Sequence, residues 1–210
     1  MKLWHCHNTR SLRPLWALEE IGIAYEIELL PFPPRVMQRD YLNVNAMGTL
    51  PYLTDGATQM SESSAICQYL ADRYGKKVAI SADHPEYGSY LNWLHFSEAT
   101  LTYPQTLVLR YERLEPQERA VPQIVEDYKR VFFARLKHLN AHLLERDFLC
   151  DGRFTIADVS VGYALHLGSC IGLDKHYSPE VISYLDRLRE RPAFKRAYSV
   201  GEEMNPFVFE

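Results

Sequence analysis

Reactive side chains gather near the N-terminus, in the segment CHNTRS at residues 6–11. The segment supplies a thiol, an imidazole and two hydroxyls, from Cys6, His7, Thr9 and Ser11. The four cysteines of the chain are widely separated, without the spacing of a metal site or a redox pair, and cytosolic thiols are normally reduced. We therefore assign Cys6 to packing. His5 and His7 have no cysteine or acid at ligand spacing, so we expect surface or turn positions for both.

The two hydroxyls are expected to have different roles. Pro14 indicates that a helix begins just before it, because proline is tolerated in the first turn, where its missing N–H has no intrahelical partner. Ser11 would then be the N-cap, with its hydroxyl bonded to the Arg13 backbone N–H. Thr9 precedes the helix, with its hydroxyl uncommitted and near the positive end of the helix dipole. Thr9 is therefore the first candidate for stabilising an anion and Ser11 the second. Arg10 or Arg13 could add a favourable charge nearby, but a solvated helix face is the commoner position for an arginine and is expected for both.

Composition and charge exclude two kinds of partner. The 210 residues carry a formal net charge of −4, so no excess of Lys and Arg is present to neutralise the phosphates of a nucleic acid. The sequence shows no signal-peptide pattern and no run of about eighteen apolar residues that would span a membrane. We expect a cytoplasmic protein with no nucleic-acid partner, no membrane partner and no metal.

Strand and helix patterns alternate in the first part of the chain. Residues 24–30 alternate apolar and polar side chains, the period of a half-buried strand, and a helix that ends at Gly22 connects them to the opening strand. A helical connection implies that the two strands are parallel. The elements expected are a strand at 1–5, a helix at 11–22, a strand at 24–30, a short helix at 36–44, a hairpin around Asp55 and Gly56 at 50–62, and a helix at 63–75.

In the second half of the chain only helical spacing remains, which predicts a helix bundle. A polar segment that ends in a proline, GKKVAISADHP, separates the halves and is typical of a domain linker. We predict an α/β domain at residues 1–77, a linker at 78–85 and an all-α domain at 86–210. Thr155 and Asp158 have the spacing of a capping box, which we assign to folding alone.

Four stretches resemble the cytosolic glutathione transferases, at family-like spacings along almost the whole chain. They are LWALEEIGIAYE, NAMGTLPYL, SESSAICQYLADRYG, and the pair FTIADVSVGYAL and RPAFKRAY. The resemblance implies a thioredoxin-like domain that binds glutathione as co-substrate, followed by an all-helical domain that binds a small apolar or aromatic electrophile. It also implies a homodimer with a role in detoxification.

The resemblance assigns glutathione-binding roles within the first domain. Pro51 corresponds to the family's cis-proline, and the Leu50 backbone would pair with the cysteinyl residue of glutathione. Glu62 would accept the γ-glutamyl ammonium, and Ser63 would bind the γ-glutamyl carboxylate together with a backbone N–H. Without the resemblance, Glu62 and Ser63 would simply be a helix start with an acidic first turn.

The thiol-activating position carries a threonine. Thr9 corresponds to the serine of the serine-type classes, which makes this resemble a bacterial enzyme with a serine or threonine active site. The cysteine of the beta class would fall at Arg10, so a covalent cysteine mechanism is not expected. The hydroxyl would stabilise the thiolate as a hydrogen-bond donor, without acting as a base.

Two positions depart from the family pattern around the glycine carboxylate of glutathione. Thr49 and Val36 stand where the family often has a lysine and a histidine or glutamine. Arg35 is the first candidate to bind this carboxylate instead, because its planar guanidinium matches the geometry of a carboxylate, and Gln38 or Arg39 is the next candidate.

The electrophile is expected between the domains, against the fourth helix. Phe96, Thr100, Tyr103 and Leu107 recur there at spacings of three and four, which also fits a bundle core. Tyr103 would give a polar contact near a break in the helix at Pro104. The tail NPFVFE would fold over this cleft or be disordered.

Two other functions share these features. One is a glutathione-dependent disulfide or peroxide reductase, in which the same thiolate attacks sulfur or oxygen. The other is a non-catalytic, transferase-like binding or regulatory protein, because a fold does not fix a function. Binding of glutathione separates the two enzymes from the third possibility.

Overall fold

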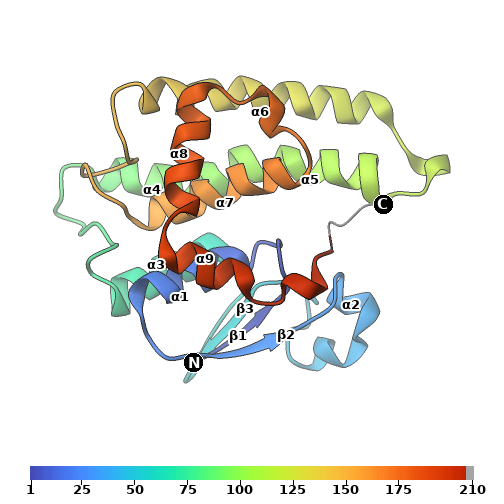
Figure 1. Ribbon diagram of the computed structural model, residues 1–210. Helices are drawn as coiled ribbons and strands as arrows, with labels where there is room; N and C mark the ends of the chain where they lie inside the picture. The colour runs from blue at the N-terminus through green and yellow to red at the C-terminus, as the bar shows by residue number, and fades with distance from the viewer. Residues whose placement is uncertain (207–210) are drawn as a thin grey trace. The chain divides into compact units, whose positions relative to one another are not determined.

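The computed structural model describes residues 1–206, which form two compact units. The first unit comprises Met1–Ser81 and the segment that begins at Arg189, and the second comprises Ala82–Leu188 (Figure 1). Helix α9 (Pro192–Ser199) therefore belongs to the same unit as the N-terminal strands. The sequence did not indicate this placement, since an amphipathic pattern does not reveal which element covers the apolar face of a helix.

The first unit is built on a four-stranded sheet in the order β2–β1–β3–β4. Its strands are β1 (Lys2–His5), β2 (Glu26–Leu29), β3 (Tyr52–Asp55) and β4 (Thr58–Met60). β1 pairs with β2 in parallel, with Leu3 opposite Ile27, which confirms the prediction from the helical connection. β3 and β4 form the predicted hairpin, and Gly56 supplies the left-handed residue of its turn, with φ +60°.

Helix α1 (Leu12–Ile21) positions the start of the candidate site. Its apolar face is fully buried and includes Leu15 and Trp16, against α3 (Ser63–Tyr74) and α9. The Trp16 ring meets Phe194 of α9 edge-on, with the ring centroids 4.9 Å apart. The helix ends at Gly22, as predicted, where the left-handed glycine N–H donates to Leu18 O at 2.9 Å.

The short helix expected at 36–44 is two separate turns. These are α2 (Pro34–Met37) and the 3₁₀ helix η1 (Arg39–Asn43). Gln38, with φ −143° and ψ 77°, interrupts them because that conformation cannot continue a helix. A further 3₁₀ turn, η6 (Glu202–Met204), follows α9.

The second unit is entirely helical in its regular structure. Its elements are α4 (Tyr87–His95), the π-helical turn η2 (Phe96–Thr102), α5 (Tyr103–Leu109), η3 (Arg110–Leu114), η4 (Gln117–Arg119), α6 (Pro122–Leu143), α7 (Ile156–Cys170), η5 (Asp174–His176) and α8 (Pro179–Arg189). Thr155 Oγ1 accepts a hydrogen bond from the Ala157 N–H at 3.3 Å, and Asp158 Oδ2 accepts one from the Thr155 N–H at 2.8 Å. The predicted capping box at the start of α7 is thus confirmed.

The helix break expected at Pro104 does not occur. Thr102 and Tyr103 keep helical dihedrals, so the chain continues from η2 into α5. The wider π-helical turn before the proline explains the continuity, because it changes the hydrogen-bond spacing that Pro104 would otherwise interrupt. Thr102 Oγ1 also donates to Ser97 O at 2.7 Å.

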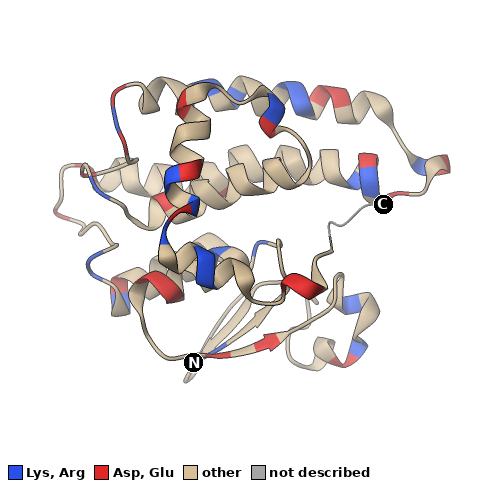
Figure 2. Ribbon diagram, viewed as in Figure 1, with Lys and Arg blue, Asp and Glu red and all other residues tan. Residues whose placement is uncertain are grey.

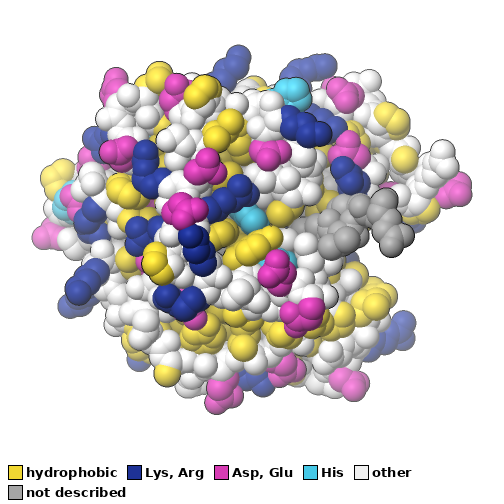
Figure 3. All heavy atoms as spheres, viewed as in Figure 1, with side chains coloured by type: hydrophobic (Ala, Val, Ile, Leu, Met, Phe, Trp, Pro, Cys, Tyr) yellow, Lys and Arg dark blue, Asp and Glu magenta, His cyan; other side chains and the backbone are white. Residues whose placement is uncertain are grey.

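Charged side chains of both signs are interspersed. Basic and acidic residues are mixed along the α6 ribbon (Figure 2), where Lys129 forms an ion pair with Glu112 at 2.6 Å. On the face drawn in Figure 3, Lys and Arg side chains lie among Asp and Glu side chains. No helix within residues 1–206 is both long enough and apolar enough to cross a membrane.

Candidate active site

Thr9 lies in a tight turn between β1 and α1. The Thr9 N–H donates to Cys6 O at 3.2 Å, and Asn8 takes the left-handed conformation with φ +57°. Asn8 Nδ2 donates to Asn205 Oδ1 at 3.0 Å, so the C-terminal segment of the same unit holds the turn. This geometry fixes Thr9 at the start of α1, as the position of Pro14 predicted.

The Thr9 hydroxyl already has partners, so the expectation that it is uncommitted is wrong. Its Oγ1 donates to Cys6 O at 2.8 Å and lies 2.8 Å from Ser11 Oγ. The turn causes this, because it folds the Cys6 carbonyl back over the side chains that follow. Thr9 retains 6% of its surface exposed whereas Ser11 has none, so only Thr9 reaches the surface.

Ser11 occupies the N-cap of α1 as predicted, but its hydroxyl does not cap the helix. With φ −69° and ψ −13°, Ser11 is already helical and its side chain turns back toward β1. Its Oγ accepts the Cys6 N–H at 3.1 Å and lies 2.8 Å from His5 Nδ1. The Arg13 N–H donates to Arg10 O at 3.2 Å instead.

His7 lies in the turn, as one of the two expectations had it, but both His5 and His7 are buried, and His5 ends strand β1, so the surface positions are wrong. Burial, with a smaller contribution from the nearby His7, lowers the pKa of His5 from 6.5 to about 4, and the Val200 and Ser11 backbones oppose the change only in part. The His7 ring packs on Tyr198, with the ring centroids 4.7 Å apart. Cys6 is buried as predicted, and burial raises the pKa of its thiol to about 11, so it is not a nucleophile at neutral pH.

A second group of site residues meets at the start of α3. The Leu50–Pro51 peptide is cis, as the resemblance implied. Glu62 is the N-cap of α3, with its side chain exposed and making no cap hydrogen bond. Ser63 is the first residue of the helix, is 3% exposed, and its Oγ accepts a hydrogen bond from Arg13 Nη1 at 3.0 Å.

Arg13 is fully buried, so the solvated helix face expected for it is wrong. Its guanidinium extends from α1 to the first turn of α3 and brings a positive charge to Ser63. The sequence contained a signal for this position: Arg13 precedes Trp16 and Ala17 by three and four residues and therefore shares their buried face. The solvated position was expected because an arginine at a helix start is usually solvated.

Arg35 lies beside the loop that leads to Leu50. A Cβ placed on Gly48 would be 2.5 Å from the Arg35 Cβ, so glycine is required where α2 meets this loop. Gly48 has φ +60°, and its N–H donates to Asn45 O at 2.8 Å. Arg35 and Gln38 are both exposed, and their predicted contacts with glutathione stay predictions.

The residues predicted to bind the electrophile lie on the α4–α5 segment of the second unit. Phe96, Thr100 and Leu107 are half-buried and Tyr103 is 55% exposed, so they do not form a fully buried bundle core. Of the tail NPFVFE, residues 207–210 lie outside the described part of the chain.

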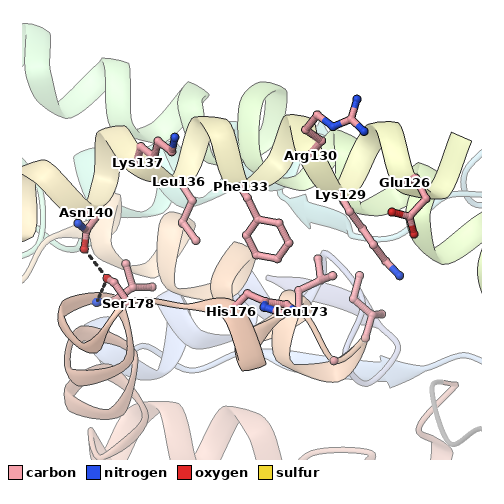
Figure 4. Close-up of a pocket in the computed structure, with 13 residues that line it drawn as sticks. Glu126, Lys129, Arg130, Phe133, Leu136, Lys137, Asn140, Leu173, His176 and Ser178 are labelled. Carbon is pink, nitrogen blue, oxygen red and sulfur yellow. Dashed lines mark hydrogen bonds between the residues drawn. The ribbon is translucent and has the colours of Figure 1, made fainter. Parts of the chain in front are cut away.

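A separate cavity in the second unit includes none of those four residues. Its volume is about 720 Å³, and it lies among α6, η5 and α8. Figure 4 shows Phe133 and Leu136 pointing into it and Lys137 pointing away. The cavity is lined by apolar and charged side chains together.

The first unit therefore has a thioredoxin-like sheet, a cis-proline and a serine at the start of α3, and a helical unit follows it. This is the architecture that the resemblance to cytosolic glutathione transferases implied. Among the described residues, no group of three or more His, Cys, Asp or Glu side chains is arranged to hold a metal ion.

Comparison with known proteins gives the same result. The sequence profile described as "Glutathione S-transferase, N-terminal domain" matches residues 9–73. Glutathione S-transferase 1 of Schizosaccharomyces pombe is 30% identical over 207 residues, which cover 94% of this chain and 87% of that protein. Glutathione S-transferase 2 of the same organism is 29% identical over 209 residues, covering 95% and 88%. The chain belongs to the glutathione S-transferase family.

A solved structure extends the likeness to the whole fold. The glutathione transferase URE2P6 from Phanerochaete chrysosporium, solved in complex with oxidized glutathione, matches with a TM-score of 0.84 and 27% identity. The match covers 97% of each chain. The predicted fold, a thioredoxin-like domain followed by a helical domain, is thus confirmed.

Proposed function

We propose that the protein is a glutathione transferase, which binds glutathione as co-substrate and activates its thiol for attack on a small apolar or aromatic electrophile. The observation that carries the proposal is the pairing of the buried Arg13 with Ser63 at the start of α3, in the unit that also presents Thr9 at the start of α1. The positive end of the α3 dipole suits a carboxylate, and that of the α1 dipole suits a thiolate.

Ser63 and Glu62 bind the two charged groups of the γ-glutamyl residue. Because Arg13 donates to Ser63 Oγ, the Ser63 hydroxyl can point its own proton at the carboxylate. The backbone N–H groups of the first turn of α3 add to this binding, since such groups have no intrahelical partner. Glu62 is exposed beside them and accepts the ammonium group.

The rest of glutathione follows the edge of the first unit. The Leu50 backbone pairs with the cysteinyl residue, as a strand would. Arg35 binds the glycine carboxylate, and Gln38 is the second candidate for that contact. The packing of Arg35 against Gly48, two residues before Leu50, supports this order of preference.

Thr9 stabilises the thiolate by donating a hydrogen bond to it. A free thiol has a pKa of about 8.5, so roughly 3% is ionised at pH 7. Lowering that pKa by two units requires ~2.7 kcal/mol of preferential stabilisation. A hydrogen bond to a charged acceptor contributes about 1.5–3 kcal/mol, and a helix N-terminus adds about 0.3–1 kcal/mol. The two together are sufficient.

The electrophile is bound by the second unit. Phe96, Thr100, Tyr103 and Leu107 are the proposed contacts, and their incomplete burial supports a role in contacting a ligand. The thiolate forms a bond to the electrophilic carbon, and the leaving group or the acceptor bond takes the electron pair. A homodimer, a cytoplasmic location and a role in detoxification stay predictions.

Calorimetric titration with glutathione tests the function directly. We expect saturable binding below millimolar concentration in the wild-type protein, and loss of binding in Ser63→Ala combined with Glu62→Gln. Absence of binding at millimolar glutathione would exclude both glutathione-dependent enzymes and leave the non-catalytic function. If glutathione binds, activity on a mixed disulfide without activity on aromatic halides would favour the reductase.

A further inference from the structure

Two buried side chains, His5 and Ser11, connect the core of the first unit to the Thr9 hydroxyl. His5 Nδ1 lies 2.8 Å from Ser11 Oγ, and Ser11 Oγ lies 2.8 Å from Thr9 Oγ1. His5 and Ser11 have no exposed surface, whereas Thr9 retains a small exposed area. The chain of hydrogen bonds therefore begins in the interior and ends at the proposed thiolate site.

The direction of the hydrogen bonds along this chain depends on the proton of His5. Each hydroxyl has one proton to donate, and a neutral imidazole has one N–H. If Nδ1 carries the proton, His5 donates to Ser11, and Ser11 can donate to Thr9 Oγ1, which lies 2.8 Å away. If Nδ1 is bare, Ser11 must donate to His5, and the Thr9 proton is then held by Ser11 or Cys6 O.

The burial of the second ring nitrogen favours a proton on Nδ1. Within the described residues, His5 Nε2 is buried and has no hydrogen-bond partner. The Val200 carbonyl also acts on the His5 ring, but among the described residues it forms no hydrogen bond with Nε2, and it lies 3.3 Å from His7 Nδ1. A buried N–H without an acceptor is less favourable than a buried nitrogen lone pair without a donor.

We propose that His5 is a positioning residue that frees the Thr9 proton for the glutathione thiolate. His5 Nδ1–H donates to Ser11 Oγ, which also accepts the Cys6 N–H, and Ser11 donates its own proton to Thr9 Oγ1. The Cys6 carbonyl accepts the Thr9 N–H at 3.2 Å, so it stays hydrogen-bonded when the Thr9 hydroxyl turns from it to the thiolate. The inference rests on the proposed function of Thr9 and adds a residue that does not touch glutathione.

Substitution of His5 gives a result whose sign decides between the two arrangements. His5→Leu removes the donor, and His5→Asn keeps an N–H close to the position of Nδ1. We expect the thiolate pKa of bound glutathione, measured by ultraviolet absorbance against pH, to rise by about 0.5 to 1 unit in His5→Leu and by much less in His5→Asn. An unchanged or lowered pKa in His5→Leu would overturn the proposal, because removing an acceptor would release the Thr9 proton.

A matched control separates this effect from general loss of packing. His7 is buried in the same turn, but its Nδ1 faces Val200 O, and it is not among the hydrogen-bond partners that the described residues give to the two hydroxyls. His7→Leu should leave the thiolate pKa within about 0.3 unit of the wild type. Combining His5→Leu with Ser11→Ala should raise the pKa no more than Ser11→Ala alone, since both interrupt one chain. Full additivity would contradict the proposal.

The His5 tautomer can also be measured without glutathione and without a variant. In a protein labelled with ¹⁵N in histidine, Nδ1 of His5 should have the chemical shift of a protonated nitrogen at pH 7 and Nε2 that of a bare one. The opposite pattern would refute the proposal even if glutathione binds. Conversely, a protein that binds no glutathione but shows Nδ1 protonated would refute the proposed function and leave the hydrogen-bond chain intact.

Discussion

Replacement of Arg13 by methionine is predicted to weaken the binding of glutathione. Arg13 Nη1 lies 3.0 Å from Ser63 Oγ, so a carboxylate bonded to that hydroxyl would be about 5 to 6 Å from the positive charge. At an effective dielectric constant of about 20, that separation corresponds to about 3 kcal/mol. Hydrogen bonds to charged groups generally contribute about 1.5–3 kcal/mol. We therefore expect the Kd of glutathione to rise about 10- to 150-fold.

Calorimetric titration of the wild type, Arg13→Met and Arg13→Gln measures this effect. Glutamine retains a neutral donor to Ser63, so its Kd should lie between those of the other two proteins. The matched ligand is glutathione with its γ-glutamyl carboxylate amidated, which should bind all three proteins with affinities within about threefold of one another. Thermal unfolding confirms that each variant is folded, because removing a buried arginine also disturbs packing.

Two outcomes would refute the role given to Arg13. A glutathione Kd within twofold of the wild type in folded Arg13→Met would mean that the charge does not reach the ligand. Equal weakening of glutathione and the amidated ligand would mean that Arg13 supports the fold of α3 and does not act on the carboxylate.

Other changes have defined outcomes. Gly48→Ala should raise the KM for glutathione, because its Cβ would lie 2.5 Å from the Arg35 Cβ and displace α2; an unchanged KM would contradict this. The pKa of His5 is lowered to about 4, so only the unfolded chain takes up this proton between pH 6.5 and 4. The free energy of unfolding in urea, measured for the wild type relative to His5→Leu, should therefore fall by up to about 3 kcal/mol as the pH falls over that range. Asp158 has the opposite effect, because burial raises its pKa to about 6 and the folded protein takes up this proton first. The free energy of unfolding relative to Asp158→Asn should therefore rise by up to about 3 kcal/mol as the pH falls from 6 to 4. A difference between the two proteins that does not change with pH would refute this prediction. Iodoacetamide should modify Cys6 only after unfolding, since the pKa of this buried thiol is raised to about 11; rapid modification of the native protein would contradict that.

Features that depend on local sequence were predictable. Pro14 locates the start of α1 because its missing N–H is tolerated only in the first turn, and Gly22 locates the end because glycine readily takes the left-handed conformation of a C-cap. The turn at Gly56 and the capping box of Thr155 and Asp158 are similarly local. Such signals require no knowledge of what packs against them.

Features that depend on distant neighbours were not predictable from the sequence. The Ser11 hydroxyl fits both a cap and a contact with β1, and only the position of His5 in the folded sheet decides between them. Arg13 likewise lies on a face that becomes buried only when α3 packs against α1. The helix starts that carry the candidate residues were therefore predictable from the sequence, while the hydrogen bonds of those residues required the structure.

The thiolate pKa of bound glutathione in Thr9→Ala tests the central claim most directly. Ultraviolet absorbance against pH gives this pKa in the wild type, Thr9→Ser and Thr9→Ala. If Thr9 donates to the thiolate, the pKa should rise by about 1 to 2 units in Thr9→Ala and stay close to the wild-type value in Thr9→Ser, which keeps the hydroxyl. An unchanged pKa in Thr9→Ala, with glutathione still bound, would contradict the account and assign the activation to another group.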